Sequence, residues 1–233
     1  MLTESLRGFN LVLVSISFLT IVLWPAVLIY YLFQNFYNWV NIAWLFPLFV
    51  YFGFLSYGIL FLIQSYVFLK IIFNPKEKTG NFDINKPNKA IIYYSISSIF
   101  MRIIEKIFSI LLIPTVFYAN LIFKLFAKHC GKKSLINPIP DPYLISIGDE
   151  CVMGRGVLII GHEISGTRII IKEVLIGNRV TIGANSIISP GVIIEDDVIV
   201  GANSYVKKDS VLEKGGFYVG NPAKLKKRKL ISK

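Results

Sequence analysis

Cysteine and histidine are nearly absent from this sequence of 233 residues, which contains two of each. Cys130 and Cys151 stand at unrelated spacing, so they predict neither a disulfide framework nor a zinc site. His129 and His162 further limit the metal chemistry that the chain could perform. We therefore expect no metal, and any proton transfer by histidine must use one of two residues.

Charge is also scarce at the N-terminal end, where residues 1–73 carry only three charged side chains. No charge interrupts the sequence between Arg7 and Lys70, a run far longer than the roughly 20 apolar residues of a membrane-spanning helix. Two spans fit inside it, at residues 11–33 and 42–69, and they predict a transmembrane hairpin. A cleaved signal peptide is disfavoured, because the apolar region is too long and a second span follows at once.

The orientation of this hairpin follows from the basic residues beside it. The connecting segment 34–41 has no lysine or arginine, whereas five lysines follow the second span between Lys70 and Lys89. By the positive-inside rule both chain ends are cytoplasmic. The sequence thus predicts an integral protein of the cytoplasmic membrane whose soluble part faces the cytoplasm.

Residues 74–89 are polar, contain proline and glycine, and are expected to form a linker. Residues 90–130 are apolar but charged at intervals, which favours amphipathic helices at the membrane interface. The alternative is a third span in the uncharged run 107–123. That run is at the lower limit of length, and Pro114 would kink it.

The remaining charge is strongly positive: the chain carries +11, of which residues 1–73 contribute +1, so the rest carries +10. A basic domain beside apolar spans suggests anionic lipid headgroups or a phosphate-bearing ligand. Nucleic acid is not expected, because no recognition motif is present. Residues 224–233 form a basic tail with six cations, which is either a solvated end or a membrane contact.

A repeat of six residues dominates the C-terminal half. Aliphatic side chains recur at every sixth position, namely Ile176, Ile182, Ile188, Ile194, Val200 and Val206. Small or β-branched residues stand four positions after each, and glycine often follows directly. A helix cannot produce period six and a simple amphipathic strand has period two, so this pattern predicts a β-helix with three hexads per triangular coil. A β-sandwich is the disfavoured alternative.

A weaker stretch with Ile147, Met153 and Ile159 precedes this block in the same phase. The spacing from Ile159 to Ile170 is eleven, so about five extra residues interrupt the coil. We place this interruption at residues 162–168. His162 stands at its head.

These residues resemble the hexapeptide-repeat acyltransferases, which include maltose, serine and sugar O-acetyltransferases. The resemblance rests on His162, on residues 174–192 (VLIGNRVTIGANSIISPGV), on 198–209 (VIVGANSYVKKD) and on 220–224 (GNPAK). It implies a left-handed parallel β-helix over residues 131–223. The stretch GHEISGTR, with the interfacial segment, also looks like the terminal membrane domains of poly-lysine-type peptide synthetases.

The resemblance further implies a homotrimer that binds acetyl-CoA or a longer acyl-CoA between neighbouring β-helices. His162 would be the general base, for which an imidazole is suited because its pKa lies near neutral pH. The cofactor groove would be lined by Gly183, Ala184, Gly201 and Ala202, whose other role is turn geometry. Lys207, Lys208 and Lys224 would meet the nucleotide phosphates.

Three further residues are candidates for binding the acceptor. Arg168 ends the interruption and either holds an anionic group or is a solvated loop residue. Glu163 is adjacent to His162, although adjacency does not show that it faces the ring. Asp141 either contacts the acceptor or, as the first residue of an Asp-Pro pair, opens a turn. An orienting partner of the His162 ring is expected but is not identifiable from the sequence.

Three functions remain open at this point. The leading one is O-acyl transfer, most simply of acetyl, from CoA to a membrane-proximal acceptor such as a lipid-linked sugar or a lipid headgroup. The second is N-acylation or peptide-bond formation on an amine. The third is a non-catalytic trimeric membrane scaffold. A γ-type carbonic anhydrase, which also has this fold, is excluded because it needs three zinc histidines.

Overall fold

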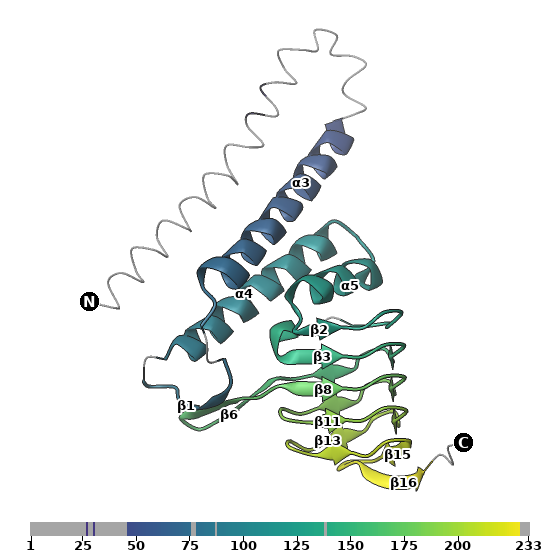
Figure 1. Cartoon of the computed structure of the whole chain (residues 1–233). Coiled ribbons are helices and arrows are strands. Elements are labelled where there is room, and N and C mark those ends of the chain that lie inside the picture. The colour runs from purple at the N-terminus through teal and green to yellow at the C-terminus, as the bar shows by residue number, and fades with distance from the viewer. Residues whose placement is uncertain are drawn as a thin grey trace. The chain divides into compact units, whose positions relative to one another are not determined.

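The structure is a computed structural model. It describes residues 27, 30, 46–75, 78–86, 88–137 and 139–228. The chain divides into two compact units, Met1–Ser65 and Tyr66–Lys233. The first is represented by one helix, and the second contains two further helices and all the strands of the described residues (Figure 1).

The apolar helix α3, Phe46–Val67, runs on into a short π-helix η1, Phe68–Ile72. Within the described residues, Val50–Ile72 is the one stretch long and apolar enough to cross a membrane, with a mean hydropathy of 1.7. Buried core helices of other proteins meet the same criterion. The other expected span, residues 11–33, lies outside the described residues except for Val27 and Tyr30. The described chain therefore contains one apolar helix, not the two of the expected hairpin.

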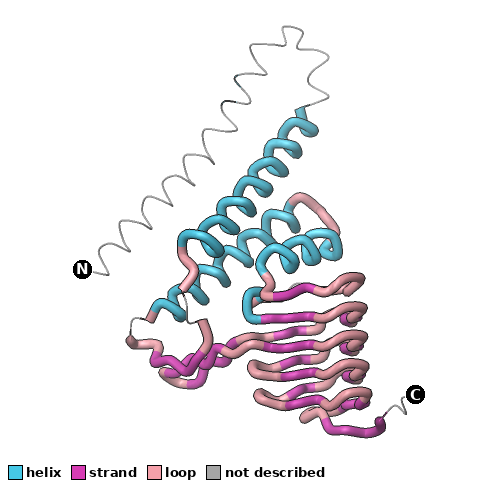
Figure 2. Tube along the Cα trace, viewed as in Figure 1, coloured by secondary structure: helices cyan, strands magenta, loops and turns pink. Residues whose placement is uncertain are grey.

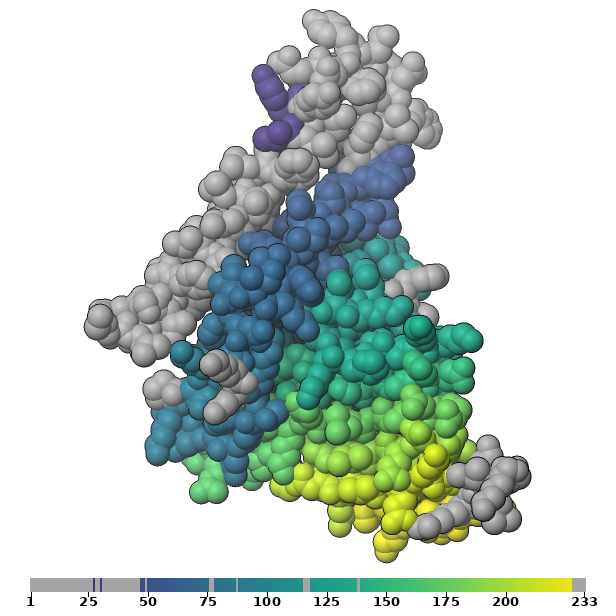
Figure 3. Space-filling view, viewed as in Figure 1, coloured from purple at the N-terminus to yellow at the C-terminus, as the bar shows by residue number. Residues whose placement is uncertain are grey.

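Three sheets, parallel except for the last strand β16, form the faces of a triangular prism like that of a left-handed β-helix, with its coils stacked in direct contact (Figures 1 and 3). We name them by their order along each coil. The first face holds β2 (His129–Cys130), β3 (Ile145–Ile147), β8 (Val174–Ile176), β11 (Ile193–Ile194) and β14 (Val211–Leu212). The second face holds β4 (Val152–Met153), β9 (Thr181–Ile182), β12 (Ile199–Val200), β15 (Gly216–Val219) and β16 (Lys224–Arg228). The third face holds β5 (Leu158–Ile159), β10 (Ile187–Ile188) and β13 (Tyr205–Val206).

The hexad prediction is confirmed by what fills the prism. The six aliphatic residues in phase are all at most 4% exposed, and each pairs with the residue one coil away. Ile176 pairs with Ile194, and Ile182 with Val200. Backbone pairing and apolar burial therefore propagate together from coil to coil.

Gly183 is required for a different structural reason from the one that the sequence suggests. The sequence suggested that Gly183 relieves a turn, but the turn residue with positive φ is Asn185, at 56°, and Asn203 repeats this one coil later at 53°. A Cβ atom on Gly183 would instead collide with the backbone nitrogen of Ala202 in the next coil. Close stacking of the coils, and not backbone conformation, requires glycine there.

Two helices cover the end of the β-helix at which β2 lies (Figure 1). Helix α4, Lys89–Ile110, begins where Asn88 accepts a hydrogen bond from the amide of Ala90 at 2.7 Å. Helix α5, Thr115–Phe126, begins directly after Pro114. The uncharged run 107–123 is thus broken between two helices, so a third continuous span is wrong, as the position of the proline explains.

The interruption of the coil is a β-hairpin that projects from the prism (Figure 2). Strands β6, His162–Ser165, and β7, Arg168–Ile171, pair antiparallel across a two-residue turn that contains Gly166 with φ at 58°. The hairpin ends at residue 171 and not at 168. The hexad pattern predicts that Ile170 belongs to the coil, because the residues of β7 after Arg168 are all isoleucine and fit the aliphatic position.

The predicted linker 74–89 contains a strand. Gly80–Asp83 forms β1, which pairs antiparallel with β7 and completes a three-stranded sheet with the hairpin. The predicted basic tail 224–233 also begins as a strand, because β16 turns back against β15 at the last coil. Residues 229–233 lie outside the described residues.

Candidate active site

His162 is the first residue of the hairpin, at the corner where the third face passes to the first. Its Nδ1 atom lies 2.6 Å from Oδ2 of Asp141. The imidazole is 23% exposed, whereas the aspartate side chain is fully buried. An ionised carboxylate only accepts hydrogen bonds, so it favours the tautomer with the ring proton on Nδ1, in which Nε2 carries the lone pair. This is the arrangement of a general base with its orienting partner.

Asp141 reaches this position because it precedes a short 3₁₀-helix, η2, Pro142–Leu144, in the first coil. Its side chain does not cap that helix. Oδ2 instead also accepts a hydrogen bond from the amide of Gly161 at 3.2 Å. The sequence reading of Asp-Pro as a turn opener was correct for the backbone, and the same residue is the partner of the ring that the sequence could not identify.

Tyrosine side chains surround this pair. The ring of Tyr94, from α4, lies 4.6 Å from the His162 ring between centroids, at an interplanar angle of 49°. Tyr143 is buried, and its pKa lies well above the usual value because of burial first and the charge of Asp141 second. Tyr93 packs edge-on against Tyr143 with centroids 4.9 Å apart. The aromatic rings shield the carboxylate from water and so strengthen its interaction with the imidazole.

Glu163 and Arg168 do not join the His162 pair. Glu163 points to Lys208, with Oε2 and Nζ 3.3 Å apart, and both side chains are exposed. Arg168 stands opposite Ser165 at the far end of the hairpin, three residues along the strand from His162. That places it roughly 10 Å away, at about 3.3 Å per strand residue. It is exposed there.

Six of the seven predicted cofactor residues fall into two groups, and the seventh, Lys224, lies in β16. Gly183, Ala184, Gly201 and Ala202 stack in consecutive coils at the corner between the second and third faces. Lys207 and Lys208 follow β13, so they lie at the same corner as His162, two coils further along. One face of the prism separates the two groups within one chain.

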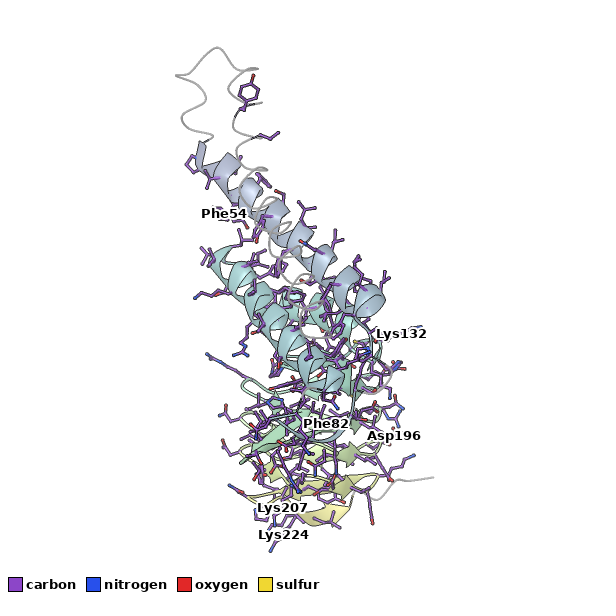
Figure 4. All side chains as sticks on the ribbon, turned by 90° about the vertical axis from the view of Figure 1, so that its left-hand side faces the viewer. Phe54, Phe82, Lys132, Asp196, Lys207 and Lys224 are labelled. Atoms are coloured by element: carbon purple, nitrogen blue, oxygen red, sulfur yellow. The ribbon has the colours of Figure 1, made fainter. Side chains whose placement is uncertain are left out.

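The cations lie toward the last coils. Figure 4 shows Lys207 and Lys224 at the end of the β-helix away from α4 and α5. Lys208 connects this end to the hairpin through its ion pair with Glu163. Lys172 forms another ion pair near the same corner, with Nζ 2.7 Å from Asp209. Since Lys172 and Lys208 are each paired with a carboxylate, the excess positive charge of this corner comes from Lys207, toward the later coils, while the side toward α4 is aromatic.

Comparison with known proteins identifies the repeat. The family described as the hexapeptide repeat of succinyl-transferase matches residues 173–208. The protein YvoF of Bacillus subtilis (strain 168), provisionally described as an acetyltransferase, is 33% identical over 90 residues, which cover 37% of this chain and 51% of YvoF. The chain thus spans about half the length of this curated relative.

One solved structure gives the same fold. A maltose O-acetyltransferase from Clostridium difficile 630 aligns with a TM-score of 0.50 at 20% identity, over 64% of this chain and 92% of its own. A galactoside acetyltransferase in complex with coenzyme A is 30% identical over 39% of this chain and 48% of its own, with a TM-score of 0.35. The first likeness shows that the described coils have the fold of a hexapeptide-repeat acetyltransferase.

Proposed function

We propose that this chain is a CoA-dependent acyltransferase that moves an acetyl or other short acyl group from acyl-CoA to an acceptor at the membrane. The observation that carries the proposal is the Asp141–His162 pair at the one break in the hexapeptide coil. A lone surface histidine needs no fully buried carboxylate at 2.6 Å. A histidine that takes and returns a proton gains from such a partner, because the carboxylate orients the ring and stabilises the imidazolium.

In the proposed reaction Nε2 of His162 accepts the proton of the acceptor hydroxyl as its oxygen attacks the thioester carbonyl carbon. The carbon–oxygen bond forms, the carbon–sulfur bond breaks, and the imidazolium returns its proton to the departing CoA thiolate. Asp141 stabilises the imidazolium in between, because the buried carboxylate is its nearest negative charge. An amine acceptor would follow the same proton path.

The split of the cofactor residues between two corners favours a homotrimer as the active species. Gly183 and His162 lie one face apart in a single chain, so a pocket that uses both must combine neighbouring chains. The outer side of the first face supports association, because Leu175, Ile193 and Val211 form an exposed aliphatic ladder, each 38–52% exposed. Exposed ladders of this kind mark interaction surfaces.

Membrane attachment is part of the proposal and rests on two features. Val50–Ile72 is long and apolar enough to cross a bilayer. Helix α4 exposes Ile99, Ile103 and Ile110 along one stripe opposite its buried face, which suits the membrane interface. The catalytic prism would then stand on the cytoplasmic side. Carbonate extraction of cell membranes tests this: recovery of the whole protein in the soluble fraction would contradict it.

The activity is tested with the purified full chain in detergent, acetyl-CoA, and separate panels of sugar and amine acceptors. Release of free CoA is followed with a thiol reagent. We expect release that depends on the acceptor and falls at least 1,000-fold in His162→Ala, on the order of the loss of a general base with its positioning. Equal release by the two proteins would remove His162 from the mechanism.

A calorimetric titration with CoA distinguishes the proposed acyltransferase from a non-catalytic scaffold. Micromolar affinity is expected of the enzyme, and Lys208→Ala should weaken it. A scaffold retained only for assembly would show no binding to either protein.

A further inference from the structure

Helix α4 brings a row of side chains to the edge of the His162 site. Tyr94, Ser98 and Arg102 follow one another at intervals of four residues, so they lie on one side of the helix. Tyr94 contacts the imidazole, with ring centroids 4.6 Å apart. The row therefore starts at the proposed base and leads away from it along α4.

The guanidinium of Arg102 folds back along this row. Its Nε donates a hydrogen bond to the carbonyl oxygen of Ser98 at 3.3 Å, one helical turn closer to Tyr94. Burial and the charge of Asp141 raise the pKa of Tyr94, and the positive charge of Arg102 acts on the same phenol in the opposite direction. Arg102 is thus directed toward the site, although it is an exposed side chain that could extend into solvent.

In the part of the chain that the structure describes, the guanidinium of Arg102 forms no ion pair. Arg155 and Arg168 also form no ion pair among the described residues, but of these arginines Arg102 is the one on the helix that carries Tyr94. A guanidinium has a planar set of donors that matches phosphate geometry. An arginine held beside a general base and left without a carboxylate fits a group supplied by the substrate.

The spacing limits what that substrate is. Tyr94 and Arg102 are eight residues apart, which is roughly 12 Å along the helix axis. Because the guanidinium of Arg102 lies at the level of Ser98, its distance from Tyr94 along the axis is roughly one helical turn, about 6 Å. A phosphate separated from the reacting hydroxyl by one sugar ring spans such a gap. The stripe of Ile99, Ile103 and Ile110 lies beyond Arg102 on the helix surface, on the side away from the packed face.

We propose that Arg102 binds a phosphate group of the acceptor while Tyr94 forms the wall that holds the acceptor against His162, so that the acceptor is a phosphorylated sugar. This inference rests on the proposed acyl transfer and adds the acceptor class to it. The phosphate can belong to a free sugar phosphate or to a lipid-linked sugar, in which case the lipid would follow the isoleucine stripe.

The experiment compares three acceptors with the full chain in detergent: glucose 1-phosphate, methyl α-glucoside, and polyprenyl-phosphate glucose in neutral phosphatidylcholine vesicles. Arg102→Gln should raise KM for both phosphorylated acceptors about 10- to 100-fold, as expected for the loss of one charge-assisted phosphate contact. It should leave KM for the methyl glucoside and for acetyl-CoA unchanged. Arg102→Lys should restore part of the loss.

Lys106→Gln is the matched control, because it removes one exposed cation one turn further along the same helix. We expect it to change each KM less than threefold. Tyr94→Leu should lower kcat about tenfold without changing KM for acetyl-CoA, because the aromatic wall is lost, and Tyr94→Phe should recover part of that loss. A preference for the vesicle-bound acceptor over glucose 1-phosphate would identify the lipid-linked source.

Calorimetry makes the outcome independent of turnover. Glucose 1-phosphate is titrated into wild type and Arg102→Gln in the presence of CoA. Binding to wild type that weakens in the variant supports the inference. If wild type binds CoA but prefers the neutral glucoside, or if Arg102→Gln and Lys106→Gln behave alike, the phosphate assignment is overturned and the acyltransferase proposal stands. If wild type binds no CoA, the proposed function fails and this inference fails with it.

Discussion

Replacing Asp141 with asparagine removes the charge beside His162 and keeps the size of the side chain. Asparagine can still accept the hydrogen bonds of Gly161 and Nδ1, so the ring should remain in place. What is lost is the attraction between carboxylate and imidazolium in the transition state. For charge centres about 4 Å apart and an effective dielectric constant of about 20, that attraction is about 4 kcal/mol. At about 1.4 kcal/mol per tenfold change, kcat should fall about 1,000-fold.

The assay is release of free CoA under saturating acetyl-CoA and acceptor, with melting curves by circular dichroism to show that the variant is folded. KM for acetyl-CoA should stay within threefold of wild type, because the side chain of Asp141 is fully buried. Asp149→Asn is the control, since Asp149 accepts the backbone amide of Lys132 at another corner. A folded Asp141→Asn enzyme that retains more than a tenth of wild-type kcat would refute the assigned role.

The structure also predicts the effects of three other substitutions. Burial raises the pKa of Glu105 above its ordinary value of 4.5. The folded protein is therefore fully stable with respect to this group below pH 4.5 and loses stability as the pH rises through the raised pKa. Glu105→Gln should melt at a higher temperature than wild type at pH 8 and at the same temperature at pH 4. Gly183→Ala should lower the free energy of unfolding by about 3 kcal/mol or more, because the added methyl group collides with the next coil, whereas Gly166→Ala in an open turn with positive φ should lower it by about 1 kcal/mol. Denaturant unfolding measures both losses, and equal losses would contradict the stacking argument. Lys208→Ala should raise KM for acetyl-CoA about tenfold while changing stability by less than about 1 kcal/mol, since its ion pair with Glu163 is exposed; a large stability loss with unchanged KM would contradict this.

The β-helix could be predicted from the sequence because its physical cause is local. Each coil repeats the same burial every six residues, so Ile188 is explained by its own hexad and its neighbours one coil away. The hairpin was located by the break in that repeat. Its end was misplaced because Ile169 and Ile171 are buried like coil residues, at 2% and 0% exposed, although they belong to β7.

The partners of His162 could not be predicted in the same way. Asp141 lies 21 residues before His162 in an irregular first coil, where the hexad pattern is absent. A carboxylate in the coil before His162 is the pattern to look for, but the sequence does not show whether Asp141 is buried beside the ring or exposed in a turn. Tyr94 and Arg102 come from a helix outside the repeat, and only tertiary packing brings that helix to the hairpin.

The sheet formed by β1, β6 and β7 decides how this protein can be shortened. Gly80 and His162 stand on opposite sides of the same residue, Ile171, in one row of that sheet. An expression fragment that begins at residue 131, where the repeats begin, would leave β7 with an unpaired edge beside the proposed catalytic base, and such edges promote aggregation. The shortest fragment with an intact histidine hairpin must therefore start before Gly80, and it must also retain α4.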